Sequence, residues 1–230
     1  MSNVRIKICG IRDAAALDAA AEAGADWVGF VFFPPSPRWV APAQAARLAS
    51  RAPPGIGPVG LFVEPTDADV EAVLRGVRLE ALQVYAAAPR IAALRARFGL
   101  PIWRALGVGT ASDLPAVAGG ADRLVLEAKP PADSTRPGGN AVPFDWSLLR
   151  GWTPPLPWIL AGGLTIATVS QAIRETGAAA VDVSSGVESA PGVKDPALIR
   201  AFIAAARSEH PQLKASRQSL PCPPTPSSKA

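Results

Sequence analysis

The sequence has 230 residues, of which 49% are hydrophobic, so the chain is long enough to bury a sizeable core in one barrel-sized domain or two small domains. Its formal charge is only +4 and its lysines and arginines form no basic stripe, so a nucleic-acid partner is not expected. No apolar run approaches the roughly 20 residues that span a bilayer, and the N-terminus lacks the apolar stretch of a signal peptide, which predicts no membrane partner and a cytoplasmic location.

Short runs rich in β-branched and aromatic residues alternate with alanine-rich stretches across residues 4–206, a pattern typical of repeated βα units. In chain order, the expected strands are Arg5–Cys9, Trp27–Phe32, Pro58–Val63, Ala81–Val84, Ile102–Ala105, Arg123–Glu127, Trp158–Ala161 and Ala180–Val183. A helical stretch follows each strand. The first is expected over Ala14–Ala23 with Asp13 as its N-cap. Another is expected over Ile166–Glu175 with Thr165 as its N-cap.

Eight such units in about 200 residues predict an α/β fold, a single (β/α)₈ TIM barrel, with an open doubly wound sheet as the alternative. The barrel domain is expected to span residues 1–207. Residues 208–230 lose the periodicity and are rich in proline and serine, which predicts a disordered C-terminal tail.

Cysteine and histidine are too scarce for several kinds of site. Cys9 lies in an apolar strand and Cys222 in the tail, a pattern that gives neither a disulfide framework nor a cluster of metal ligands. His210 is the only histidine. General acid and base chemistry is therefore left to carboxylates, cysteine, lysine or tyrosine, and no metal site is expected.

Cys9 ends the first expected strand, where a TIM barrel builds its active site. Because side chains alternate along a strand, Lys7 and Cys9 share one face and the flanking isoleucines share the other. If the isoleucines pack outward against helices, Lys7 points into the barrel beneath Cys9, where its charge would favour the reactive thiolate. An inert buried cysteine is the alternative.

Two loops carry residues suited to binding a phosphate. Gly162 and Gly163 follow the seventh strand and let the backbone approach an anion closely. After the eighth strand, amide and hydroxyl donors are offered at a helix start by Ser184, Ser185 and Gly186. Because these loops are neighbours in a barrel, together they predict a phosphate site, although each alone also fits an ordinary turn.

Asp182 lies between Val181 and Val183 in the eighth strand, and alternation places it inside the barrel. A buried carboxylate needs a partner. The eighth strand closes a barrel against the first, so we expect Asp182 to pair with Lys7 and to fix the floor under Cys9.

The sequence allows Glu127 and Arg38 either a role in the active site or a structural role of the kind common for such residues. Glu127 ends the sixth strand, where a carboxylate can serve as an acid or pair with Lys129 or Arg123. Arg38 lies in the proline-rich loop after the second strand. Its planar fork suits bidentate pairing with a carboxylate, and a solvated loop arginine is the alternative.

Four sequence blocks resemble the signature blocks of the phosphoribosylanthranilate isomerase family, namely KICGIR (7–12), GFVFFPPSPRWV (29–40), AGGLT (161–165) and DVSSGVE (182–188). They occur in the family's order and follow the first, second, seventh and eighth expected strands. The stretch AKPPADSTRPGGNAVPFDWSLL from Ala128 resembles the family's glycine-rich loop and FDW after the sixth strand. The resemblance covers nearly all of residues 4–206.

The resemblance implies an isomerase of tryptophan biosynthesis that needs no cofactor and acts on a phosphorylated small molecule. In this Amadori rearrangement, a general acid protonates the ribose ring oxygen as the ring opens, and a general base then removes the proton at sugar C2. The resemblance assigns the base to Cys9 and the acid to Glu127. It implies that Arg38 faces the anthranilate carboxylate. Substrate contacts are also expected from Tyr85 and Asp182. The sequence leaves a monomer and a homodimer open.

Two residues depart from the family's pattern. Glu127 stands where the family has aspartate, and a misplacement of the proton by about an ångström costs about 10²-fold in rate. Tyr85 replaces the histidine of a QLHG-like run, where it can contact the anthranilate ring or cover the barrel rim. A phosphosugar-binding barrel with reduced or lost catalysis is the alternative function. The related histidine-pathway isomerase is disfavoured because it has an aspartate where this chain has Cys9.

Overall fold

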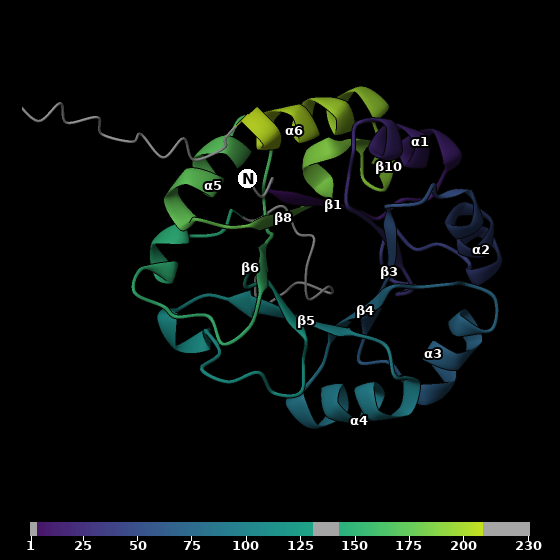
Figure 1. Cartoon of the computed structure of the whole chain (residues 1–230), viewed down its shortest axis with the longest axis horizontal. Helices are drawn as coiled ribbons and strands as arrows, with labels where there is room; N and C mark the ends of the chain where they lie inside the picture. The colour runs from purple at the N-terminus through teal and green to yellow at the C-terminus, as the bar shows by residue number, and fades with distance from the viewer. Residues whose placement is uncertain (1–3, 131–142, 209–230) are drawn as a thin grey trace, which may run out of the picture.

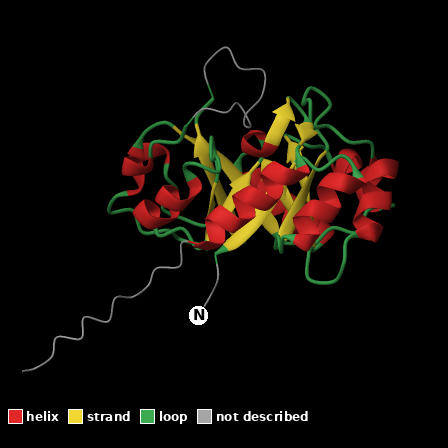
Figure 2. Cartoon of the chain, turned by 90° about the horizontal axis from the view of Figure 1, so that it is seen from above, coloured by secondary structure: helices red, strands yellow, loops and turns green. Residues whose placement is uncertain are grey.

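The computed structural model describes residues 4–130 and 143–208, which form a closed barrel of parallel strands ringed by helices (Figure 1). The eight barrel strands are β1 (Arg5–Cys9), β2 (Trp27–Val31), β3 (Gly57–Val63), β4 (Ala81–Tyr85), β5 (Ile102–Val108), β6 (Arg123–Ala128), β7 (Trp158–Leu160) and β8 (Ala180–Val183). Each strand pairs with the next along the chain, and β8 pairs with β1. Figure 2 shows the helices flanking the strands from another side. The predicted (β/α)₈ TIM barrel is confirmed, and the open doubly wound sheet is excluded.

Six α-helices cover the outside of the barrel in the described residues: α1 (Ala14–Glu22), α2 (Pro42–Arg51), α3 (Asp67–Leu74), α4 (Ala88–Phe98), α5 (Val169–Thr176) and α6 (Pro196–Ser208). The first predicted helix is confirmed, because the side chain of Asp13 caps α1 by accepting a hydrogen bond from the N–H of Ala16 at 2.8 Å. The predicted cap at Thr165 is wrong. α5 begins at Val169 with Thr168 as its N-cap, after a turn in which the N–H of Thr165 donates to Oγ1 of Thr168 at 3.0 Å.

In the part of the chain that the structure describes, two connections show no α-helix where the sequence predicts one after every strand. After β5 the chain forms only η1 (Ala111–Asp113), a short 3₁₀ helix. After β6 the described part of the connection contains only η2 (Trp146–Leu149), another 3₁₀ helix. A third, η3 (Ser185–Val187), follows β8 and leads into an antiparallel hairpin that the sequence did not predict, made of β9 (Glu188–Ala190) and β10 (Val193–Lys194).

The barrel interior changes character along its axis. Near the N-terminal ends of the strands it is apolar and aromatic, with Trp27 and Trp103 in an edge-to-face contact at a centroid distance of 4.9 Å. Towards the C-terminal ends the inward side chains become polar, and Lys7, Asp182 and Glu127 are all buried there. An apolar layer thus supports a charged layer at the end where the site is expected.

Several sequence predictions fall on residues outside the described ranges. The predicted tail is one of them, except that its first residue, Ser208, is the last residue of α6. Most of the glycine-rich loop after β6 also lies outside, in residues 131–142. In residues 4–130 and 143–208, no helix is long and apolar enough to cross a membrane. The same residues contain no group of three or more His, Cys, Asp or Glu side chains that could hold a metal ion.

Candidate active site

The parallel strands bring four predicted site residues to one end of the barrel. Cys9 is the last residue of β1 and Tyr85 is the last residue of β4. Glu127 is the penultimate residue of β6, and Asp182 lies in β8. Because all eight strands run the same way, their C-terminal ends share the face on which TIM barrels build active sites.

Lys7 and Asp182 form a buried ion pair across the seam that closes the barrel. They are register partners of β1 and β8, and Nζ of Lys7 lies 3.0 Å from Oδ2 of Asp182. Ile6 and Ile8 are fully buried in the core around the barrel, as alternation predicts. The expected pairing is therefore confirmed. The other carboxylate oxygen, Oδ1 of Asp182, is buried without a hydrogen-bond partner among the described residues.

Burial opposes both charges of this pair. It lowers the pKa of Lys7, but the charges of Asp182 and Cys9 outweigh burial and raise that pKa overall. Burial raises the pKa of Asp182, and the charge of Lys7 opposes that rise. The ammonium group of Lys7 is therefore held in its protonated form beneath Cys9.

The side chain of Cys9 is buried at the inner end of the site, with 5% of the residue exposed. Burial raises the pKa of the thiol above its ordinary value, and the charge of Lys7 reverses only part of that rise. The expectation that Lys7 favours the thiolate is therefore confirmed, but burial has the larger effect on the pKa. The neutral thiol is the main form at neutral pH, because the loss of hydration outweighs the nearby cation.

Tyr85 connects the surroundings of Cys9 to Glu127. Its hydroxyl donates a hydrogen bond to Oε1 of Glu127. Its ring packs against the apolar group formed by Cys9, Val31 and Leu61. Burial, and after it the charge of Glu127, raises the pKa of Tyr85 well above its usual value, so the hydroxyl remains a hydrogen-bond donor. Tyr85 therefore lies between the two groups to which the sequence assigns proton transfer.

The two cations considered as partners for Glu127 have other contacts. Nζ of Lys129 lies 4.0 Å from Oδ1 of Asp113. The guanidinium of Arg123 lies over the rings of Trp27 and Trp103, at centroid distances of 5.1 and 5.3 Å.

Arg38 is buried rather than solvated, which excludes the alternative of a solvated loop arginine. Its Nε and Nη2 donate to the two carboxylate oxygens of Glu188 at 2.8 and 3.0 Å. This is the bidentate geometry that a guanidinium fork favours. Nζ of Lys194 donates to Oε1 of the same carboxylate at 2.6 Å.

The two predicted phosphate loops touch each other. A Cβ atom added to Gly186 would lie 2.0 Å from the carbonyl oxygen of Leu164, so the backbones of the loops after β7 and β8 are in close contact. Gly162 and Gly163 adopt positive φ values of 82° and 66°, which side chains other than glycine rarely tolerate. The structure thus brings the predicted phosphate glycines together at one end of the barrel.

The serines of this site differ in their surroundings. The hydroxyl of Ser184 donates to the carbonyl oxygen of Cys9 at 3.1 Å, which ties the loop after β8 to the end of β1. Ser185 begins η3. Of the two, Ser184 is already engaged within the protein.

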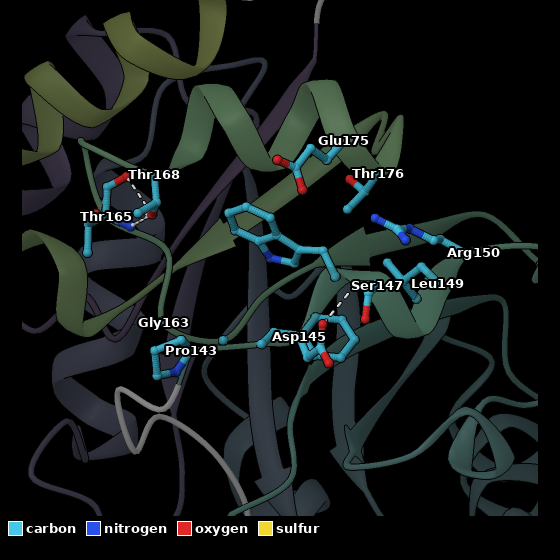
Figure 3. A pocket seen from close by; sticks show the side chains of 13 residues that line it. Pro143, Asp145, Ser147, Leu149, Arg150, Gly163, Thr165, Thr168, Glu175 and Thr176 are labelled. Carbon is cyan, nitrogen blue, oxygen red and sulfur yellow. Dashed lines mark hydrogen bonds between the residues drawn. The ribbon is translucent and has the colours of Figure 1, made fainter.

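A pocket of about 710 Å³ opens beside the loop after β7 (Figure 3). It is lined by this loop, by η2 with its flanking residues and by α5, including Gly162, Gly163, Thr165, Thr168, Asp145, Arg150, Glu175 and Thr176. Cys9 and Glu127 lie inside the barrel and are not among its lining residues. The pocket therefore adjoins the loop that the sequence predicts to bind phosphate, and not the residues to which the sequence assigns proton transfer.

Sequence reasoning missed three polar residues of this region, of which Lys194 and Gln83 are buried and Glu188 is partly buried. Glu188 and Lys194 lie in the hairpin after η3, beyond the last barrel strand, where alternation along that strand no longer predicts direction. The only signal for Glu188 is its place at the end of the DVSSGVE block, and Lys194 has none. Gln83 is buried with Oε1 unpaired among the described residues. Its place two residues before Tyr85, on the same strand face, is the signal that could have found it.

Comparison with known proteins adds to this geometry. The family described as N-(5'phosphoribosyl)anthranilate (PRA) isomerase matches residues 6–205. The chain belongs to this family. An N-(5'-phosphoribosyl)anthranilate isomerase from Acidiphilium cryptum is 56% identical over 204 residues, which cover 89% of this chain and 98% of the relative. Another, from Paramagnetospirillum magneticum, is 55% identical over 213 residues, with 90% and 99% covered.

Solved structures of phosphoribosylanthranilate isomerases share the fold. That of Thermotoga maritima is 33% identical, with a TM-score of 0.77, and the match covers 90% of this chain and 100% of the other. A second, with the same values, is in complex with reduced 1-(o-carboxyphenylamino)-1-deoxyribulose 5-phosphate. A third, with a TM-score of 0.76, 33% identity and the same coverage, consists of monomers generated from the dimeric Thermotoga maritima enzyme. These relatives therefore include dimeric and monomeric forms.

Proposed function

We propose that Cys9 and Glu127 are the general base and the general acid of this chain, which is an enzyme of tryptophan biosynthesis that isomerises N-(5'-phosphoribosyl)anthranilate. The observation that carries the proposal is their placement. Both are buried, both lie at the C-terminal ends of their strands on the same face of the barrel, and β7 and β8 separate these strands. A sugar held over this face would be approached by the two groups from different sides.

Ring opening is the first step. Glu127 gives its proton to the ring oxygen of the ribose while the bond from that oxygen to C1 breaks. The lone pair of the anthranilate nitrogen forms a double bond to C1, which leaves a protonated Schiff base. Tyr85, as a permanent donor to Oε1, holds the carboxyl group in one orientation during this transfer.

Proton abstraction at C2 is the second step. The thiolate of Cys9 takes this proton, the electrons of the C–H bond form the double bond between C1 and C2 of an enolamine, and the π electrons of the C1–N double bond return to the nitrogen as its lone pair. The enolamine then tautomerises to the ketone. Because burial raises the pKa of the thiol, the charge of Lys7 beneath it is needed to stabilise the thiolate.

Binding and positioning fall to the remaining residues. Arg38 receives the anthranilate carboxylate, and Oδ1 of Asp182, which lacks a partner among the described residues, accepts a hydrogen bond from a sugar hydroxyl. The phosphate binds to the two touching loops, with donors at Gly162, Gly163, Ser184, Ser185 and Gly186. The contact of Tyr85 with Glu127 supports a role in positioning the acid in addition to the predicted contact with the substrate ring.

The assembly and location of the enzyme belong to the same proposal. A monomer or a homodimer is supported by the dimeric and monomeric forms of the relative from Thermotoga maritima. A cytoplasmic location is supported by the place of the reaction in amino-acid biosynthesis. The barrel domain is proposed to end near residue 207, close to the end of α6 at Ser208.

Consumption of the substrate tests the proposal against a protein that only binds phosphosugars. Phosphoribosylanthranilate is generated in situ from anthranilate and phosphoribosyl pyrophosphate, and its fluorescence is followed after addition of the purified full chain. An accelerated decrease is expected. A decrease no faster than background, in a protein that still binds the reduced carboxyphenylamino-deoxyribulose phosphate, would show a binding protein instead.

A further inference from the structure

We propose that the hairpin of β9 and β10 is a positioning element for the substrate carboxylate, in which Glu188 orients the guanidinium of Arg38 and Lys194 fixes Glu188. Neither Glu188 nor Lys194 has a role in the proposed chemistry. The inference rests on the proposed function of Arg38 as the receptor of the anthranilate carboxylate, and it adds the residues that give this receptor its orientation.

The carboxylate of Glu188 is held from two sides. Oε1 accepts hydrogen bonds from Nε of Arg38 at 2.8 Å and from Nζ of Lys194 at 2.6 Å. Oε2 accepts from Nη2 of Arg38 at 3.0 Å and from the N–H of Gly192 at 3.3 Å. With two donors on each oxygen, the carboxylate has one orientation, and the planar guanidinium that it binds is fixed in the same plane.

Lys194 anchors this carboxylate to the end of β1. It is 5% exposed, and its ammonium group also donates to the carbonyl oxygen and to Oγ of Ser184 at 2.9 and 3.2 Å. Ser184 in turn donates to the carbonyl oxygen of Cys9. A continuous chain of hydrogen bonds therefore runs from Arg38 to the backbone of the residue that the sequence assigns as the base.

The turn of the hairpin is packed against the loop that carries Arg38. A Cβ atom added to Gly192 would lie 2.2 Å from the carbonyl oxygen of Pro37, the residue before Arg38. Nη1 of Arg12 donates to that same oxygen at 3.0 Å and to the carbonyl oxygen of Gly192 at 3.5 Å. Backbone and side-chain contacts thus hold the hairpin and the receptor loop together.

Loss of Glu188 has two opposite expected effects on the affinity for the substrate carboxylate, one from its charge and one from the orientation that it gives Arg38. Burial alone would raise the pKa of Glu188, but Arg38 and Lys194 outweigh burial and keep that pKa below its ordinary value, so the group is a carboxylate. Removal of this negative charge would by itself strengthen the attraction of Arg38 for an anion. A weaker affinity for the substrate carboxylate after removal therefore cannot come from the change of charge, and it is the result that lost orientation predicts.

Two probes separate orientation of the carboxylate receptor from a general structural role. One is reduced 1-(o-carboxyphenylamino)-1-deoxyribulose 5-phosphate, and the other is the same compound without the ring carboxylate. Titration calorimetry on the purified full chain measures both dissociation constants. For Glu188→Gln we expect the Kd of the carboxylate probe to rise about tenfold and that of the second probe to stay within about twofold. For Lys194→Met we expect a rise of about threefold, again confined to the carboxylate probe.

Two further variants serve as controls. Glu22→Gln makes the same chemical change at an exposed ion pair with Arg200 and should leave both constants unchanged. Arg38→Lys should abolish the preference for the carboxylate probe. If it does not, the proposed role of Arg38 fails. If Arg38→Lys abolishes the preference but Glu188→Gln tightens binding, leaves it unchanged or weakens both probes equally, only the positioning role of the hairpin is overturned. Lys194→Met provides the same comparison if Glu188→Gln does not fold.

Discussion

The hydroxyl of Tyr85 donates a hydrogen bond to Oε1 of the Glu127 carboxyl group inside the barrel. Tyr85 is the last residue of β4 and Glu127 the penultimate residue of β6, at the same end of the barrel. They are also the two positions at which the sequence analysis predicts a departure from the pattern of the family. The two departures are therefore in direct contact, which gives the longer side chain of Glu127 a partner that fixes its end.

Replacement of Tyr85 by phenylalanine keeps the ring and removes the donor. A hydrogen bond to the negative charge that develops on Glu127 as it gives up its proton contributes about 1.5 to 3 kcal/mol, so we expect kcat to fall about 10- to 100-fold while KM changes little. Steady-state kinetics with the in situ substrate measure both constants. An unchanged kcat with a raised KM would instead make Tyr85 only the substrate contact predicted from the sequence.

The pH dependence of Cys9 alkylation tests its environment. The thiolate is the reactive form and burial raises the pKa of the thiol, so the rate should rise with pH and reach its midpoint above that of free cysteine measured alongside. In Lys7→Met the lowering effect of the ammonium is lost, and the midpoint should move further up. The measurement uses a Cys222→Ser background, so that Cys9 is the only thiol. A midpoint below that of free cysteine would show that the cation outweighs burial.

Loss of the partner of Lys7 should destabilise the protein. Asp182→Asn leaves a buried ammonium without its counter-charge, and we expect the free energy of unfolding in urea to fall by about 3 kcal/mol. The charge of Asp182 also raises the pKa of Cys9, so the thiol midpoint should move down in this variant. Asp18→Asn, which breaks an exposed pair with Arg51, is the control and should change stability little. Equal stability of Asp182→Asn and the wild-type protein would contradict a structural role for the pair.

Gly162→Ala tests the loop that is proposed to bind phosphate. Its φ of 82° disfavours any side chain, and a Cβ there would lie 2.7 Å from the backbone nitrogen of Ala128, next to Glu127. Gly99→Ala has a similar φ of 66° with nothing within 4 Å, so it isolates the cost of backbone strain, about 1 kcal/mol. We expect Gly162→Ala to lower stability more than Gly99→Ala and, unlike it, to raise KM. Equal KM values in the two variants would argue against phosphate binding at this loop.

The sequence predictions for the barrel interior rest on the alternation of side chains along each strand. It placed Lys7 and Asp182 correctly, because both lie within regular strands whose direction fixes each side chain. It could not weigh burial against charge at Cys9, since burial depends on every element packed around that strand. Outside the strands the prediction failed. The predicted helix cap at Thr165 is wrong because Thr165 lies in a turn before the helix, where its N–H donates a hydrogen bond to Oγ1 of Thr168. The partner of Arg38 was not found, because Glu188 lies 150 residues away on a hairpin that the strand pattern does not mark.

The central claim is that Cys9 and Glu127 transfer the protons, and turnover of Cys9→Ser and Glu127→Gln tests it most directly. The fluorescence assay gives kcat for each variant, and calorimetry with the reduced carboxyphenylamino-deoxyribulose phosphate gives its Kd. We predict a loss of about 10³-fold in kcat for each variant, within the range that general acid or base groups contribute, with Kd changed less than about threefold. Wild-type turnover in either variant would contradict the role proposed for that residue.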